Sequence, residues 1–321
     1  NADYDFGTNP CSEIILRPYQ FCNLTEVVVR SDDTIKDLER KIELATILGT
    51  IQSTLTDLKY LRKIWRDNTE EERLLGVSLT GIMDNELLNT ASAGYLSDLL
   101  LQLKQVAVDT NLRLSEQLGI PQSTAITCVK PSGTVSQLVD SASGIHARHS
   151  EYYIRTVRGD KKDPLTQFMQ SAGVPVEDDI MQPDSTVVFS FPVRSPKKAV
   201  TRNDTGALEQ LNLWLKYQKN WCEHKPSVTI TVKEDEWLDV GAWVYENFND
   251  VAGISFLPHS DHTYKQAPYQ ECTKEEYLDL KKKMPKNINW QDLSELEKED
   301  STRGGQELAC TADSCEIVDI T

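Results

Sequence analysis

An amide, a thiol and a carboxylate occupy alternate positions near the start of the chain, at Asn9, Cys11 and Glu13. Pro10 disfavours the helical region for the residue before it, so we expect Asn9 to be extended. If the extension continues to Glu13, alternation places the three side chains on one face. That face would offer a hydrogen-bonding group, a redox-active or nucleophilic sulfur and a general base. The trio suits one-electron or nucleophilic chemistry on a hydroxylated substrate.

A second candidate site is a turn between a predicted strand and a predicted helix. Its residues are Pro131, Ser132, Gly133, Thr134, Val135 and Ser136. Such a turn can direct backbone N–H groups and hydroxyls at an anion, aided by the helix N-terminus. The pattern alone also fits an ordinary turn, because many strand–helix turns contain Gly and Ser. Lys130 and Arg148 fit either an added positive charge for that anion or a place on the surface.

The chain has seven Cys among 321 residues, which is too sparse for a disulfide scaffold. Cys22 fits either a redox thiol or a small hydrophobe beside Phe21 and Leu24. Cys128 lies in an apolar run and is predicted to be a core residue. Cys222 and Cys272 have no partner at metal-ligand spacing, and we interpret both as structural.

Two further thiols, Cys310 and Cys315, stand near the C-terminus. Their spacing does not match a C-x-x-C zinc site, and no second pair completes a tetrahedral set of ligands. Two thiols on a flexible arm suit disulfide exchange, since the arm can reach a buried disulfide and then an external reductant. His146 and His149 are interpreted as plain polar residues, so no metal site is predicted.

Composition sets the broad class of protein. The chain is 39% hydrophobic and 26% charged, as is usual for a soluble globular protein, and we expect it in the cytoplasm. No apolar run reaches membrane-spanning length. The net charge of −16 argues against a nucleic-acid partner. The chain begins with Asn and its first Met is Met83, from which we predict a piece of a longer protein.

The hydrophobic pattern predicts an α/β architecture with a mainly parallel sheet or a barrel. Thr69 and Glu72 have the form of a capping box that would open the segment 74–79. We predict a catalytic portion over 1–298 and a flexible redox-active tail over 299–321. The predicted helices cover 34–65, 95–118, 205–223 and 234–248. The predicted strands cover 123–129, 152–157, 187–193, 227–232 and 254–257.

The motifs resemble a known family. Asn-Pro-Cys-Ser-Glu-Ile with Phe-Cys-Asn-Leu-Thr-Glu resembles the active-site segment of ribonucleotide reductases. It is most similar to the adenosylcobalamin-dependent class, particularly its monomeric ribonucleoside-triphosphate members. Matching segments follow in order from Asn9 to Cys315, including Leu75–Asp84, which we interpret as structural. The resemblance implies the C-terminal half of a ten-stranded α/β barrel, with a finger loop that carries the reactive Cys. The first half-barrel would belong to a missing N-terminal half.

The resemblance also implies a role for each candidate residue. Cys11 would carry a thiyl radical that removes the ribose 3′ hydrogen, while Glu13 takes the 3′-hydroxyl proton and Asn9 bonds the sugar hydroxyls. Cys22 would supply reducing equivalents and then pair with a Cys of the N-terminal half. The turn from Pro131 to Ser136 would bind the substrate phosphates. Cys310 and Cys315 would pass electrons from a thioredoxin-like reductant.

The cofactor follows from the same resemblance. A reductase with a di-iron or di-manganese centre needs adjacent tyrosines as a radical route, whereas Tyr264 stands alone. The sequence from Asp261 to Tyr269 resembles the cobalamin-dependent class, which favours adenosylcobalamin. The predicted function is reduction of ribonucleotides, with triphosphates favoured, for DNA synthesis. The isolated chain is expected to be inactive without the N-terminal half.

Three alternatives stay open. The first is a ribonucleoside-diphosphate reductase that uses the same radical. The second is a non-catalytic, nucleotide-binding half that only complements a separate N-terminal polypeptide. The third is a thiol oxidoreductase that does not act on nucleotides.

Overall fold

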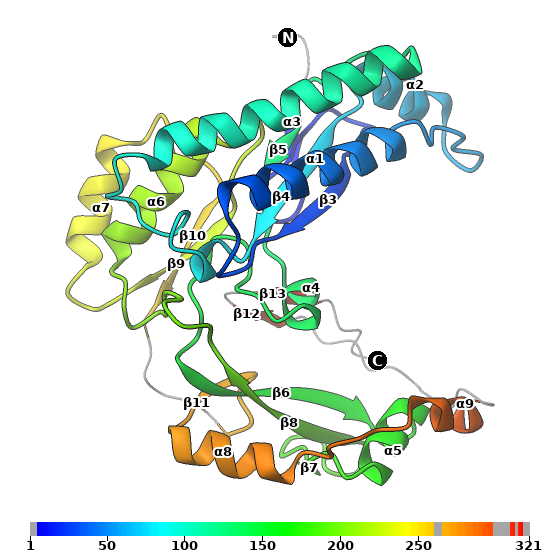
Figure 1. The fold of residues 1–321 in the computed structure, drawn as a ribbon, viewed down its shortest axis with the longest axis vertical. Coiled ribbons are helices and arrows are strands. Elements are labelled where there is room, and N and C mark those ends of the chain that lie inside the picture. The colour runs from blue at the N-terminus through cyan, green and yellow to red at the C-terminus, as the bar shows by residue number, and fades with distance from the viewer. Residues whose placement is uncertain (1–4, 260–264, 298–308, 312–313, 317–321) are drawn as a thin grey trace. The chain divides into compact units, whose positions relative to one another are not determined.

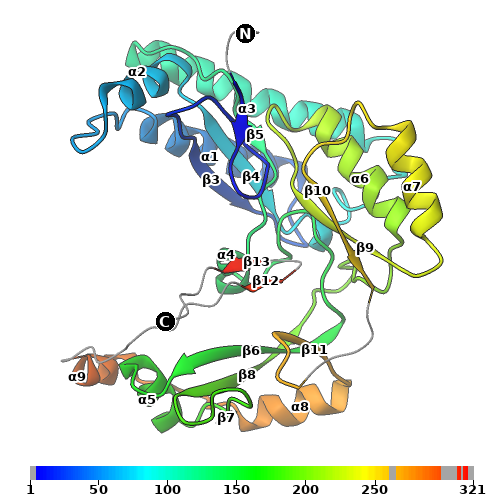
Figure 2. The ribbon, with the colours of Figure 1, turned by 180° about the vertical axis from the view of Figure 1, so that it is seen from behind.

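The computed structural model describes residues 5–259, 265–297, 309–311 and 314–316, the last two as backbone strands. The chain divides into two compact units. The first consists mainly of the described residues up to Arg148 and of Lys197–His259, and the second mainly of His149–Pro196 and of the described residues that follow His259. Figures 1 and 2 show the elements of each unit from opposite sides.

A parallel sheet forms the centre of the first unit. Its strand order is β3-β4-β5, with β3 at Asn23–Val28, β4 at Leu75–Thr80 and β5 at Thr127–Cys128. The helix α1 (Ile35–Gln52) contacts β3 and β4 and packs against α3 (Leu96–Leu118), so two long helices cover this sheet (Figure 1). Every residue of β4 is buried, as expected for the central strand of a covered parallel sheet.

Local signals set the ends of the two long helices. Thr34 and Asp37 form a capping box at the start of α1. Gly119 adopts a left-handed conformation directly after α3, as is common for a glycine that ends a helix. The predicted helix over 34–65 is wrong in its extent, because α1 ends at Gln52 and α2 begins at Lys63. The hydroxyl groups of Ser53 and Thr54 donate to backbone carbonyls at this end of α1, which competes with continuation of the helix.

The predicted capping box at Thr69 and Glu72 is also wrong. Both residues belong to the last turn of α2 (Lys63–Glu72). Arg73 follows with a φ of 43°, and its N–H donates to the carbonyl of Thr69, which terminates the helix. The apolar run after it is therefore a strand, β4, and not a helix.

A second parallel pair completes the first unit. Strand β9 (Val228–Val232) pairs with β10 (Ile254–Pro258), and the helices α6 (Ala207–Asn220) and α7 (Trp237–Glu246) accompany them. A parallel bridge between Val129 and Pro226 connects the β5 edge to the chain entering β9. The parallel arrangement that the sequence predicted is therefore present in this unit.

Two buried tryptophans, one in α6 and one directly after it, hold these two sheets together. The indole of Trp214 donates to the carbonyl of Pro226 at 2.6 Å, and the indole of Trp221 donates to the carbonyl of Cys128 at 2.8 Å. Both indoles belong to the hydrophobic core of the unit. A buried Trp needs such a partner for its N–H, so these bonds fix α6 to the strand ends.

The second unit contains a four-stranded antiparallel sheet of order β11-β6-β8-β7. The sequence patterns located its two long strands but not their antiparallel pairing. The strands are β6 (Tyr152–Asp160), β7 (Val176–Asp178), β8 (Thr186–Arg194) and β11 (Tyr269–Glu271). The helices are α5 (Pro164–Ser171), α8 (Lys274–Lys283), the 3-10 turn η2 (Trp290–Asp292) and α9 (Leu293–Leu296).

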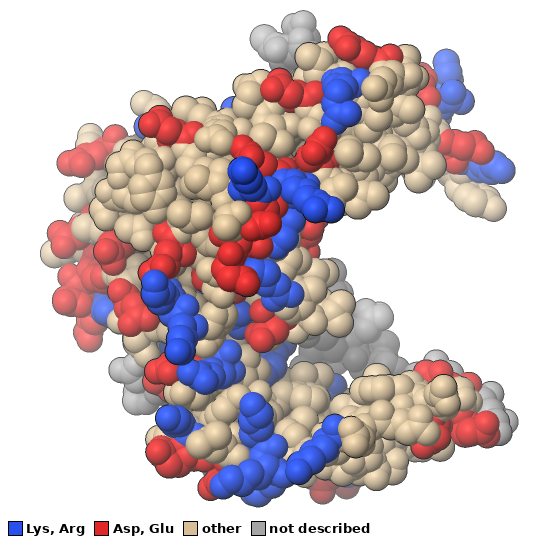
Figure 3. All heavy atoms as spheres, in the orientation of Figure 1, with Lys and Arg blue, Asp and Glu red and all other residues tan. Residues whose placement is uncertain are grey.

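Shorter elements complete the chain. A hairpin of β1 (Gly7–Thr8) and β2 (Ile15–Leu16) lies at its start, and β12 (Ala309–Thr311) pairs with β13 (Ser314–Glu316) near its end. The 3-10 turn η1 (Ile82–Asp84) follows β4, and α4 (Thr134–Leu138) follows β5. Within the described residues, none of the helices combines the length and apolar character that a membrane crossing requires. Acidic and basic side chains are interspersed on the face drawn in Figure 3.

Candidate active site

The β1–β2 hairpin carries the amide, thiol and carboxylate. Thr8 pairs with Ile15, so the loop between the strands contains all three side chains. The predicted extension from Asn9 to Glu13 is wrong. The N–H of Ser12 donates to the carbonyl of Asn9 at 2.9 Å, which closes a β-turn with Pro10 at its second position. Ser12 has a φ of 62°, so alternation of side chains cannot hold across it.

The turn nevertheless brings two of the predicted residues into direct contact. The Asn9 amide Nδ2 donates to Glu13 Oε1 at 2.6 Å. The Asn9 Oδ1 accepts the N–H of Ile14 at 3.0 Å, so one side chain bonds both the carboxylate and the loop backbone. Cys11 lies at the turn between them, is partly exposed and forms no disulfide with another described cysteine. The hairpin loop therefore carries a partly exposed thiol two residues before an oriented carboxylate.

Glu13 is fully buried, yet only one of its carboxylate oxygens is engaged. Oε1 accepts from Asn9 and from the Lys130 ammonium, the latter at 2.7 Å. Oε2 is buried and has no hydrogen-bond partner in the described part of the chain. A buried carboxylate oxygen without a partner is costly, so it marks a place where an absent donor would bind.

Helix α2 anchors the chain between the two candidate thiols. The Arg17 guanidinium, which is 2% exposed, pairs with Glu71 and Glu72 of that helix at 3.1 and 3.3 Å. The ring of Phe21 stacks on Trp65 of the same helix at 6.0 Å between centroids. These contacts fix the path of the backbone from Cys11 to Cys22.

Cys22 lies directly before β3, against the sheet. Its sulfur is 3.3 Å from the point that a Cβ on Gly76 would occupy, and the sulfur of Cys128 is 3.4 Å from the same point. A Cβ at Gly76 would also crowd the side chain of Leu24, so the absence of a side chain at Gly76 allows these residues to pack closely. Burial raises the pKa of the Cys22 thiol well above its usual range, and the negative charge of Glu13 raises it further. Cys22 and Glu13 therefore share one electrostatic environment.

Two buried cysteines and His224 pack around the β3-β4-β5 sheet. Cys128 is fully buried and Cys222 is 7% exposed, in agreement with their predicted structural role. His224 Nε2 bonds the carbonyl of Leu75 at 2.8 Å. Burial lowers the pKa of His224 below its usual value, although the charge of Glu13 acts in the opposite direction.

The predicted anion turn begins immediately after Lys130, the residue that contacts Glu13. Two of its N–H groups are engaged inside the loop: Ser132 donates to Ser143 Oγ at 2.8 Å and Ser136 donates to Ser132 Oγ at 3.1 Å. The N–H groups of Gly133, Thr134 and Val135 have no acceptor among the described residues. These three amides come from the turn where it enters α4, so they are available to an anion.

A buried ion pair holds the loop that follows this turn. Arg148 Nε and Nη2 donate to the two carboxylate oxygens of Asp84 at 2.9 and 2.8 Å, and both side chains are 3% exposed. Asp84 also accepts the N–H of Ala142, and Arg148 donates to the carbonyl of Asp140. The surface interpretation of Arg148 is therefore wrong, because the side chain is buried and paired with Asp84. The pairing of Asp84 with Arg148 was not predicted, since the two residues are 64 positions apart and no local pattern connects them.

The two C-terminal thiols belong to paired strands. Cys310 is in β12 and Cys315 is in β13, and their side chains lie outside the described structure. Tyr264 also lies outside the described residues. Among the described residues, no group of three or more His, Cys, Asp or Glu is arranged to hold a metal ion.

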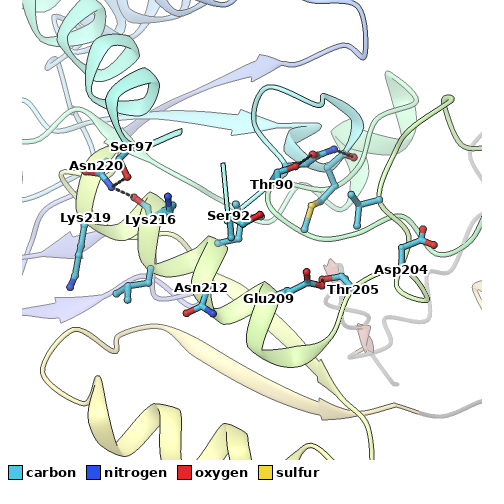
Figure 4. Close-up of a pocket in the computed structure, with 16 residues that line it drawn as sticks. Thr90, Ser92, Ser97, Asp204, Thr205, Glu209, Asn212, Lys216, Lys219 and Asn220 are labelled. Atoms are coloured by element: carbon cyan, nitrogen blue, oxygen red, sulfur yellow. Dashed lines mark hydrogen bonds between the residues drawn. The ribbon is translucent and has the colours of Figure 1, made fainter. Parts of the chain in front are cut away.

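A separate pocket of about 710 Å³ lies elsewhere in the first unit, between α6 and the loop before α3. Figure 4 shows Lys216, Lys219 and Asn220 toward one end and Asp204 and Glu209 toward the other. None of the sequence-predicted site residues lines it. Its two lysines already have partners, because Lys216 donates to a backbone carbonyl and Lys219 pairs with Asp250. The β1–β2 hairpin, and not this pocket, is therefore the candidate active site.

Two solved structures share the fold of this chain. The fold matches a B12-dependent (class II) ribonucleotide reductase with a TM-score of 0.77 and 24% identity, over 94% of this chain and 45% of that one. It also matches the alpha subunit of an Actinobacillus ureae class Id ribonucleotide reductase with a TM-score of 0.53 and 15% identity, over 79% of this chain and 53% of that one. The mixed α/β fold is thus shared with ribonucleotide reductases. No family model matches the chain.

The sequence relatives of the chain are reductases of one type. An adenosylcobalamin-dependent ribonucleoside-triphosphate reductase of Euglena gracilis is 31% identical over 96% of this chain and 42% of its own length. A protein of the same name from Lactobacillus delbrueckii subsp. bulgaricus is 28% identical over 88% of this chain and 41% of its own length. The chain is a relative of the adenosylcobalamin-dependent ribonucleoside-triphosphate reductases, and it spans about two fifths of their length.

Proposed function

We propose that the chain is a catalytic part of an adenosylcobalamin-dependent reductase that converts ribonucleoside triphosphates to 2′-deoxyribonucleotides for DNA synthesis. The observation that carries this proposal is the hairpin loop. There a partly exposed thiol, Cys11, lies two residues before a buried carboxylate, Glu13, whose Oε2 has no hydrogen-bond partner in the described part of the chain. The names and sequence similarity of the relatives support the reaction.

Each site residue has a defined task in this reaction. The Cys11 sulfur, as a radical, takes the 3′ hydrogen atom of the ribose and returns it to the 3′ carbon after the 2′ carbon is reduced, which regenerates the sulfur radical. Glu13 Oε2 accepts the 3′-hydroxyl proton, and the Asn9 amide orients the carboxylate. The 2′-hydroxyl leaves as water, and two thiols are oxidised to one disulfide, which balances the two electrons that the sugar gains. Cys22 is one of those thiols.

The turn from Pro131 to Ser136 is proposed to bind the substrate phosphates. Its support is the set of backbone N–H groups at Gly133, Thr134 and Val135 that are available at the start of α4. Lys130 lies at the start of this turn and contacts Glu13, so the phosphate loop and the sugar chemistry adjoin one another. A substrate bound at the turn therefore has its sugar near the hairpin.

Adenosylcobalamin fits the site in one respect that the structure supports. The Cys11 thiol is partly exposed at a hairpin turn and forms no disulfide with another described cysteine, so a radical source can reach it. When bound, this cofactor supplies a carbon-centred radical by cleavage of its cobalt–carbon bond. The chain's own contribution is to present the thiol and to hold the carboxylate beside it.

The remaining parts of the reductase also belong to this proposal. The five parallel strands β3, β4, β5, β9 and β10 would form one half of a ten-stranded barrel, with the β1–β2 hairpin as its finger loop. A separate N-terminal half would supply the other strands and the Cys that pairs with Cys22. Residues 299–321 would act as a flexible redox tail, in which Cys310 and Cys315 exchange electrons with a thioredoxin-like protein. The compartment would be the cytoplasm.

The test is reduction by a reassembled enzyme. The chain is co-expressed with the part of the Euglena gracilis relative that it does not match, and dCTP and dCDP formation are measured with adenosylcobalamin and a small dithiol. We expect dCTP from CTP only when both polypeptides are present. Faster reduction of CDP would favour the diphosphate alternative, and no reduction of either nucleotide would contradict the proposal.

The redox tail has its own test. Cys310→Ser or Cys315→Ser should stop multiple turnover with thioredoxin and leave turnover with a small dithiol nearly unchanged. Equal loss with both reductants would rule out a shuttle. The thiol-oxidoreductase alternative predicts that general disulfide reduction survives Cys11→Ala.

A further inference from the structure

One basic side chain enters the site without an assigned task. Lys130 lies between β5 and the predicted phosphate turn, and its side chain is 33% exposed. Its ammonium is 2.7 Å from Glu13 Oε1, so the residue points at the carboxylate. Its backbone N–H donates to Ser78 Oγ at 2.8 Å, which fixes the start of the side chain against β4.

The contacts of Glu13 are unevenly divided between its oxygens. Asn9 and Lys130 both donate to Oε1, at 2.6 and 2.7 Å. Oε2 is buried and has no partner in the part of the chain that the structure describes. Two donors on one oxygen fix the rotation of the carboxylate, and they leave the other oxygen as the acceptor with free lone pairs.

We propose that Lys130 is a positioning residue for Glu13, which it holds so that Oε2 faces the substrate hydroxyl. This inference rests on the proposed function and adds to it. Lys130 also joins the two halves of the site, because it is adjacent to Pro131 at the phosphate turn and its ammonium contacts the hairpin. A shift of the turn would therefore be transmitted to the carboxylate.

Electrostatics agree with this geometry. Partial burial acts to lower the pKa of Lys130, but the hydrogen bond to Glu13 and its negative charge outweigh that effect and raise the pKa. Lys130 is therefore held as an ammonium, which can donate but cannot accept a hydrogen bond. A group that only donates cannot compete with Glu13 for the substrate proton.

The first experiment separates positioning from substrate binding. Lys130→Met and Lys130→Arg are measured in the reassembled enzyme with CTP. We expect Lys130→Met to lower kcat by about 10²-fold with little change in KM, since a misplaced catalytic group loses rate and not binding. Lys130→Arg, which keeps the charge, should lose less. An unchanged kcat, a rise in KM alone, or equal losses in both variants would overturn the proposal. Lys198→Met, which removes an exposed pair with Glu86, is the matched control and should not change either constant.

The second experiment needs no activity and uses the 321-residue chain alone. Urea unfolding is measured for Lys130→Met, for Glu13→Gln and for the double variant. Lys130→Met should raise the unfolding equilibrium constant by about 100-fold when Glu13 is present, because a buried carboxylate loses its cation. The same change should cost less than about tenfold in the Glu13→Gln background. Additive effects would show that the two side chains do not interact.

The two experiments distinguish failure of this inference from failure of the proposed function. If wild-type chain yields no dCTP, the reductase assignment fails, while the unfolding cycle still reports whether Lys130 holds Glu13. If wild-type chain reduces CTP and Lys130→Met does so equally well, only the inference fails.

Discussion

Glu13 and Asp84 are two buried carboxylates of the same unit, and their cations hold them in opposite ways. Arg148 occupies both oxygens of Asp84 through Nε and Nη2, and the pair is almost fully buried. Lys130 and Asn9 occupy one oxygen of Glu13 and leave the other without a partner in the described structure. The first arrangement satisfies the carboxylate and stabilises a loop. The second leaves hydrogen-bonding capacity for a reacting group, which is the physical mark of a functional carboxylate.

The largest expected effect is on catalysis by Glu13, whose Oε2 has no hydrogen-bond partner in the described structure. Glu13→Gln should lower CTP reduction by about 10²–10⁴-fold, because the amide cannot accept the proton that general-base catalysis requires. Its free energy of unfolding should change by about 1 kcal/mol or less, since the remaining cation, Lys130, is partly hydrated and not left buried. Steady-state kinetics and urea unfolding measure the two quantities. A large loss of stability without a loss of rate would show that Glu13 has a structural role and not a catalytic one.

Asp84, whose two carboxylate oxygens are both occupied, should instead matter mainly for stability. Asp84→Asn should lower the free energy of unfolding by about 3–5 kcal/mol, because it removes the buried carboxylate that neutralises the Arg148 guanidinium, although the ion pair of Arg148 with the exposed Asp140 remains. Because the pair holds the loop after the phosphate turn, KM for CTP should rise in any protein that still folds. Chemical denaturation measures the first effect. A change below about 1 kcal/mol would show that the pair does not hold the loop.

An exposed pair provides the reference for both carboxylates. Lys198 and Glu86 are 2.7 Å apart, and both side chains are more than half exposed. Lys198→Ala should change the free energy of unfolding by no more than about 1 kcal/mol, because solvent screens such pairs. If this variant lost as much stability as Asp84→Asn, burial would not be what separates the two kinds of carboxylate.

The smallest expected effect is on pH dependence. Burial lowers the pKa of His224, so the folded chain disfavours the imidazolium. Above the usual pKa of about 6.5 both states hold a neutral ring, and the residue costs nothing. As pH falls below that value the unfolded chain binds a proton first, so stability should fall. Unfolding curves between pH 7 and pH 5 should show this fall, and His224→Gln should reduce it. An unchanged slope in the variant would assign the fall to other groups.

Sequence reasoning located the helices and strands that carry a strong local pattern. The helix over 95–118 and its closing Gly119 are close to α3, because apolar periodicity and a left-handed glycine act within a few residues. The break after Gln52 was not predicted, since it depends on hydroxyl groups that bond the backbone of the preceding turn. The capping pattern at Thr69 failed because Arg73 ends a helix there.

The candidate site was predictable in its residue types but not in its geometry. Asn9 and Glu13 do meet, although through a turn around Ser12 and not along an extended strand. The task of Lys130 could not be predicted, because its partner is 117 positions away in the chain. Contacts between distant segments are set by the packing of β4 and β5, and no local pattern reports them.

Isotopic substitution at the ribose tests the central claim most directly. The reassembled enzyme is given CTP with deuterium at the 3′ carbon, and dCTP formation is followed for wild-type chain and for Cys11→Ser. If Cys11 takes the 3′ hydrogen beside Glu13, the wild-type chain shows a primary isotope effect and Cys11→Ser forms no dCTP. Reduction of CTP by Cys11→Ser at the wild-type rate would contradict the account.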